Sequence, residues 1–159
     1  RRQRQMCIRD RIKNRMKTQT IGYDKINQLR HAKFLKNMDG VRAHMKKHAA
    51  IIAPKFDVVL KAFNTELGGK GIAEWTNPNG GYFISLNVLN GCAKRTVELC
   101  KEAGVVLTPA GATYPYGKDP DDSNIRIAPT FPPVEELELA VDLLCTSVQL
   151  AAAEKLLAE

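Results

Sequence analysis

Arg126 lies in a short segment whose residue types suit the binding of a carboxylate. Over residues 124–128, Ile125 and Ile127 alternate with polar or small residues, which predicts a strand with one buried face. The arginine would then point away from the core, with its guanidinium held on a rigid element. A fixed planar fork of donors suits bidentate binding of a carboxylate. The alternative is an exposed strand arginine that is only solvated.

His44 and His48 lie four residues apart and would share one face of a helix. Such a pair can hold zinc, but a methionine and two lysines separate them, with no glutamate and no evident third ligand. We therefore expect a solvated helix face and no metal site.

Cysteine usage and hydropathy indicate the compartment. The four cysteines form no CxxC motif and no paired spacing, so they fit small buried thiols in a reducing compartment. The apolar runs are far shorter than the ~20 residues of a membrane helix, and no signal-peptide pattern occurs near the start. We expect a cytoplasmic protein with no membrane partner. The cysteines are Cys7, Cys92, Cys100 and Cys145.

The positive charge is concentrated in the first part of the chain. Of the net charge of +7, residues 1–70 contribute 18 Lys or Arg against 5 Asp or Glu, and residues 71–159 contribute 6 against 12. Residues 1–11 hold five arginines and one aspartate and show no helical or strand period. They resemble translated sequencing-adapter sequence, so we expect a disordered, non-natural tail. The alternative is a basic arm that binds nucleic acid, although it lacks interleaved aromatic residues.

Helix caps and apolar spacing predict two helices before the sheet. Asp24 can cap a helix over residues 25–37. Asp39 can cap a second, longer helix over about residues 39–67. Pro54 lacks a backbone donor and is expected to bend this longer helix.

Short apolar runs predict about four strands. They occupy residues 72–75, 82–86, 105–108 and 124–128. The first two are expected to pair antiparallel across the turn at 77–81.

Two more helices are expected among and after these strands. Asn90 can cap a helix over residues 91–103, which Gly104 would close in the left-handed conformation. Thr130 can cap the last helix, which would extend to about Leu156. The whole is an α+β fold with a small sheet of about four strands, packed against a long kinked N-terminal helix and two later helices.

Four motifs occur in a fixed order along the chain. They are Gly80-Gly81-Tyr82-Phe83, Pro109-Ala110-Gly111, Tyr114 and Asn124-Ile125-Arg126-Ile127. In this order they resemble the small domain of class I/II aminotransferases of the aspartate-aminotransferase type, which are fold-type I enzymes that use pyridoxal phosphate. The resemblance covers roughly residues 12–157. It implies a helical connector from a large domain over residues 12–38 and the small, C-terminal domain over 39–159.

The resemblance also implies the reaction and the residues that bind substrate. Members transfer an amino group between an amino acid and a 2-oxo acid, and the arginine of the last strand binds the α-carboxylate. That role is assigned to Arg126. Phe83 or Tyr82 would border the substrate pocket, since alternation allows only one of them to face it, and Tyr114 would lie at its mouth. A place in the core is the alternative for the Tyr82–Phe83 pair.

The same resemblance implies that the catalytic centre is incomplete within these residues. In the family, pyridoxal phosphate forms a Schiff base with a lysine of the large domain. Lys13, Lys17 and Lys25 do not lie in that lysine's motif. We expect a C-terminal fragment that is inactive alone. We also expect the full-length protein to be a homodimer, with residues 18–31 near the partner subunit.

Two other functions fit the residues. One is a basic interaction module for RNA, whose binding would depend on salt because phosphate contacts release counterions. The other is a non-catalytic amino-acid-binding domain that retains Arg126. Of these possibilities the enzyme fragment is favoured, and it has small-molecule substrates and no nucleic-acid partner.

Overall fold

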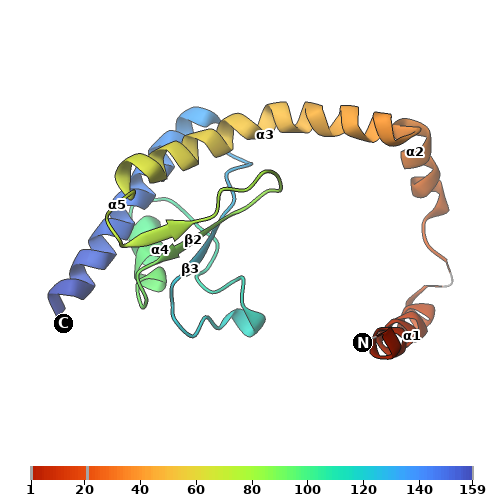
Figure 1. The fold of residues 1–159 in the computed structure, drawn as a ribbon, viewed down its shortest axis with the longest axis horizontal. Helices are drawn as coiled ribbons and strands as arrows, with labels where there is room; N and C mark the ends of the chain where they lie inside the picture. The colour runs from red at the N-terminus through yellow and green to blue at the C-terminus, as the bar shows by residue number, and fades with distance from the viewer. Residues whose placement is uncertain (1, 21, 159) are drawn as a thin grey trace. The chain divides into compact units, whose positions relative to one another are not determined.

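The computed structural model describes residues 2–20 and 22–158, with side chains from Met6 onward. The chain forms two compact units, one ending at Lys47 and the other beginning at His48. Figure 1 shows the elements of both. No helix of the described residues is long and apolar enough to cross a membrane.

The first unit is entirely helical. It contains α1 (Arg2–Gln19), α2 (Lys25–Leu35) and the start of α3 (Met38–Glu66). Asp24 caps α2 as predicted, because its carboxylate accepts a hydrogen bond of 2.9 Å from the backbone N–H of Asn27. None of the described side chains of this unit is buried.

Two predictions for the first unit differ from the structure. Of the segment expected to be a disordered tail, residues 2–11 belong to α1 and residue 1 lies outside the described residues. Residues 2–19 contain no glycine or proline and many long side chains with good helix propensity. The cap of α3 is Asn37 instead of Asp39: its Oδ1 accepts from the backbone N–H of Gly40 at 2.9 Å. The helix therefore begins before the expected residue and continues through Pro54 to Glu66.

The second unit combines the later part of α3 with a sheet and two further helices. The strands β1 (Ala73–Trp75), β2 (Ile84–Val88) and β3 (Asn124–Ile127) form an antiparallel sheet in the order β1-β2-β3. The helices are α4 (Ala93–Glu102) and α5 (Val134–Ala158), and a short 3₁₀ turn spans Pro115–Gly117. The α+β class and the antiparallel pairing of the first two strands are as predicted.

One hydrophobic core joins the sheet to α3, α4 and α5. The inward positions of β2 and β3 alternate along each strand, and Ile84, Leu86 and Ile125 are fully buried. They belong to one cluster with Val59 and Phe63 of α3 and with residues of the last helix. The α5 members of the cluster are Leu137, Val141, Leu144, Cys145, Val148 and Ala151.

The sheet has three strands and not four, because residues 105–108 do not pair. Val105 and Leu107 are half-buried against the core while Val106 is exposed, so the run packs as an extended segment with no ladder partner. The cap expected at Asn90 is also wrong: α4 begins after Cys92, which makes no side-chain cap bond. Gly104 does adopt the predicted left-handed conformation, at φ +93°.

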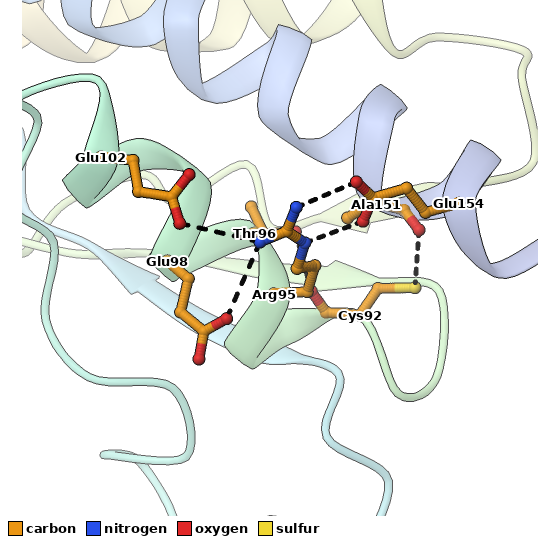
Figure 2. Close-up of polar contacts among 7 residues, drawn as sticks. All are labelled: Cys92, Arg95, Thr96, Glu98, Glu102, Ala151 and Glu154. Carbon is orange, nitrogen blue, oxygen red and sulfur yellow. Dashed lines mark hydrogen bonds and ion pairs between the residues drawn. The ribbon is translucent and has the colours of Figure 1, made fainter.

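An arginine on α4 ties that helix to α5 (Figure 2). Arg95 donates from Nε and Nη2 to the two carboxylate oxygens of Glu154, at 2.8 and 2.9 Å. Its Nη1 lies 3.9 Å from Glu98 and 3.8 Å from Glu102. The Arg95–Glu154 pair has the bidentate geometry in which an ion pair between helices is strongest.

Candidate functional site

The alternation that buries one face of the sheet leaves a polar row on the other. Ser85 of β2 lies opposite Arg126 of β3, and Asn87 lies opposite Asn124. On the far side Asn87 also faces Glu74 of β1. We call these five residues, Glu74, Ser85, Asn87, Asn124 and Arg126, the polar sheet face.

The guanidinium of Arg126 contacts an aromatic ring instead of a carboxylate. Its Cζ lies 4.6 Å from the ring centroid of Phe83, a cation–π contact that fixes the plane of the guanidinium. Arg126 makes no ion pair with any described acidic residue. Its Nε is buried and has no hydrogen-bond partner.

An unpartnered Nε has a chemical consequence. A buried donor without an acceptor destabilises a protein by about 1–3 kcal/mol, so native structures rarely keep one without a reason. In a guanidinium, Nε and a neighbouring Nη point the same way and can donate two parallel bonds to one carboxylate. Arg126 lies beside an aromatic ring with a buried Nε that no described residue engages, and its two Nη groups are the donors that a carboxylate could reach.

The aromatic residues of the predicted site separate in space. Phe83 faces Arg126, whereas its neighbour Tyr82 is 56% exposed. Phe83 is itself 49% exposed. The strand predicted over 82–86 begins only at Ile84, so strand alternation does not apply to this pair. Tyr114 lines a cavity of about 600 Å³ that also includes Glu74 and Asn87.

Sequence reasoning missed the hydrogen bonds around Asn124. The residue is buried at 7% exposure, and its side chain bonds to Ser85, Asn87 and Thr113. The available signal was an asparagine at an alternating strand position, a residue type that strands disfavour. Its partners depend on strand register, which the sequence alone does not provide.

The loop before β3 is ordered by one carboxylate. Asp119 accepts backbone hydrogen bonds from Asp121, Ser123 and Asn124 at 3.1, 2.9 and 2.8 Å. Desolvation raises the pKa of Asp119, but these three bonds stabilise the anion and bring the pKa below its usual value. Gly111, at φ +78°, lets the same loop close: a Cβ there would lie 2.8 Å from the carbonyl oxygen of Gly117.

Comparison with known proteins identifies the family. Residues 8–159 match the family described as aspartate amino-transferase. The chain belongs to this family. The match includes residues 8–11, which the sequence analysis assigned to a non-natural tail.

Individual relatives agree with this membership. The chain is 55% identical over 134 residues to an aspartate aminotransferase of Corynebacterium glutamicum, covering 84% of this chain and 31% of that protein. It also resembles a crystal structure of an aspartate transaminase from C. glutamicum, with a TM-score of 0.85 and 51% identity over 92% of this chain and 35% of that one. The chain therefore spans about a third of the length of these relatives.

A more distant relative shares the fold. The α-aminoadipate aminotransferase LysN of Thermus thermophilus has a TM-score of 0.62 and 20% identity, covering 76% of this chain and 30% of that one. That structure was solved in complex with N-(5'-phosphopyridoxyl)-L-leucine.

The other residues considered in the sequence belong to helices and not to the polar sheet face. Lys13, Lys17 and Lys25 belong to α1 and α2 of the first unit. His44 and His48 lie on α3, and no group of three metal-ligating side chains occurs among the described residues. Of the residues predicted to bind substrate, the structure brings together Arg126 and Phe83.

Proposed function

We propose that this chain is the C-terminal part of a pyridoxal phosphate-dependent aminotransferase and that Arg126 binds the α-carboxylate of its substrates. The reaction is the reversible transfer of an amino group between an amino acid and a 2-oxo acid. Membership in the aspartate aminotransferase family supports the reaction class. The placement as the C-terminal part rests on the order of the motifs.

One observation carries the assignment to Arg126. Its guanidinium is half-buried, is stacked on Phe83 and forms no ion pair with a described acidic residue, so its donors are not used within the described fold. A carboxylate accepting one hydrogen bond from each Nη group would give the guanidinium an anionic partner without needing the buried Nε. Two parallel bonds would also fix the orientation of the substrate about its Cα–carboxylate bond.

The aromatic residues have supporting roles in this proposal. Phe83 holds the guanidinium plane and excludes water from one side of it. Tyr114 borders the mouth of the pocket at the neighbouring cavity. Tyr82, with its ring more than half exposed, contacts groups that lie outside the described residues.

The described residues of this chain do not form a cofactor site by themselves. Pyridoxal phosphate requires a lysine for its aldehyde and several donors for its phosphate. No lysine lies on the polar sheet face, and the donors of Arg126 suit a carboxylate. The lysine and most of the cofactor contacts would come from the rest of the full-length protein, so the chain alone is expected to be inactive.

The first unit supports a place within a larger assembly. Ile26, Leu29 and Phe34 of α2 are apolar yet 55–73% exposed, and the unit buries no described side chain. In the proposed cytoplasmic, homodimeric protein these residues pack against the large domain, and residues 18–31 lie near the partner subunit.

Kinetics of the full-length protein test the assignment. Loss of two charge-assisted hydrogen bonds should raise KM for amino acids at least about 100-fold in Arg126→Ala. Arg126→Lys should recover only part of this, because an ammonium does not reproduce the fork of donors. The matched control is Arg42→Ala, which removes an exposed arginine paired with Asp39 at 3.4 Å and should leave KM unchanged.

Two results would refute the proposal. The first is an unchanged KM in Arg126→Ala. The second is a gene sequence upstream of this segment that encodes a stop or an unrelated domain in place of a domain with a Schiff-base lysine.

A further inference from the structure

Asn124 lies two residues before Arg126 on the polar sheet face, and every hydrogen-bonding group of its side chain is engaged. Its Nδ2 donates to Ser85 Oγ at 2.9 Å and to Asn87 Oδ1 at 2.6 Å. Its Oδ1 accepts from Thr113 Oγ1 at 2.6 Å. The asparagine thus joins both strands of the site to the loop before β3.

The stability of the sheet alone does not explain this residue. Asparagine is disfavoured in strands, and a buried amide destabilises a protein unless all of its bonds are made. A β-branched residue would fit the strand better. A fully bonded amide does provide a single arrangement of its neighbours, because any change of rotamer leaves several polar groups unpaired.

The neighbours that bond to the Asn124 side chain include Ser85 of β2 and Thr113 of the loop before β3. Ser85 is the cross-strand partner of Arg126, and its Oγ is held by Nδ2 of the asparagine. Thr113, which bonds to Oδ1, immediately precedes Tyr114. The backbone N–H of Asn124 also donates to Oδ2 of the loop-ordering carboxylate.

We propose that Asn124 is a positioning residue for substrate binding that acts through Arg126. It fixes Ser85 beside the guanidinium and fixes the Thr113–Tyr114 turn at the edge of the site. Arg126 has no acceptor at its own Nε, so its placement depends on the ring of Phe83 and on neighbours held in this way. This inference rests on the proposed function of Arg126.

Steady-state kinetics of the full-length enzyme, with L-aspartate as the probe, test the inference. Misplacement of a binding group lowers substrate affinity more than it lowers the rate of the chemical step. Asn124→Ala should therefore raise KM about 10-fold, with kcat within about twofold of its original value. Thr113→Val removes only the loop bond and should raise KM about threefold. The control is Thr146→Val, which removes a hydrogen bond from a threonine hydroxyl to the backbone carbonyl of Asp142 on α5 and should leave KM unchanged.

A double-mutant cycle separates positioning from general damage to the fold. If Asn124 acts through the guanidinium, Asn124→Ala should raise KM no further in the Arg126→Ala background. Equal increases in both backgrounds would overturn the inference, as would an unchanged KM in both single variants, Asn124→Ala and Thr113→Val. Should Asn124→Ala fail to fold, the same cycle with Thr113→Val decides the question.

The controls distinguish failure of this inference from failure of the proposed function. If Arg126→Ala raises KM and the Asn124 and Thr113 variants do not, Arg126 keeps its role and the positioning role is wrong. If Arg126→Ala itself leaves KM unchanged, the proposed function fails first.

Discussion

Two arginines of the second unit, Arg95 and Arg126, are both half-buried but have opposite environments. Arg95 makes a bidentate pair with Glu154 and has two further carboxylates within 4 Å (Figure 2). Arg126 has an aromatic ring at 4.6 Å, no described carboxylate and one orphan donor. The first is satisfied within the fold and connects two helices. The second pairs with no described acidic residue, which is the pattern expected of the carboxylate-binding role proposed for it.

The largest effect is expected from giving Arg126 a carboxylate of its own. Ser85→Asp places an acid directly opposite Arg126 in the strand register. Opposite charges on facing strand positions pair, so this acid would occupy the donors that the proposal assigns to the substrate carboxylate. KM for L-aspartate in the full-length enzyme should rise about 100-fold while the thermal unfolding midpoint does not fall. Ser85→Asn is the matched uncharged control, and an equal loss in both variants would contradict the explanation.

A smaller effect is expected when the ring beside Arg126 is removed. Cation–π contacts contribute roughly 0.5–2 kcal/mol, so Phe83→Leu should raise KM about 3- to 20-fold. Phe131→Leu serves as the control, because that phenylalanine is 96% exposed and is not among the residues predicted to bind substrate. Equal KM values in the two variants would mean that the stacking has no part in binding.

Arg95 should show the reverse pattern, with stability changed and binding unchanged. Arg95→Ala removes the bidentate pair between α4 and α5 and should lower the thermal unfolding midpoint by about 2 °C. KM should stay at its original value, because this pair belongs to the contact between the helices. A KM increase comparable to that of Phe83→Leu would remove the distinction between the two arginines.

The smallest effect is expected in the pH dependence of the thermal unfolding midpoint. The hydrogen bond from Arg95 lowers the pKa of Glu154, against the opposing effect of desolvation. A carboxyl whose folded pKa is depressed contributes stability above its unfolded pKa, near 4.5, and loses it as the pH falls through the folded value. Unfolding midpoints measured from pH 7 to pH 3 should therefore fall less steeply in Glu154→Gln. Identical pH profiles for the two proteins would contradict this linkage.

The sequence was most informative where local pattern decides structure. The alternation around Arg126 predicted a strand with the guanidinium on the polar side, and the position of Gly104 predicted a left-handed helix end. The pairing of the first two strands followed from the turn between them. Each of these features depends on residues that are neighbours in the chain.

Predictions failed in two situations. In one, the structure depends on a strand or residue that is distant in sequence. In the other, two neighbouring residues can each cap the same helix. Residues 105–108 have a strand-like composition, but no strand pairs with them. Asn37 and Asp39 are both good helix caps, and only backbone geometry selects the first. The bonds of Asn124 require the register of β2 against β3, which no local pattern contains.

The backbone of Gly111 lies close to the carbonyl of Gly117, and this close approach limits which substitutions the loop can accept. Any side chain there would both strain a left-handed residue and collide with the carbonyl of Gly117. Substitutions intended to change substrate preference should therefore leave Gly111 unchanged. Tyr116, one residue before that carbonyl, has a 99% exposed side chain whose identity can be varied, but its left-handed φ of 59° and its place beside Gly117 argue against insertions there.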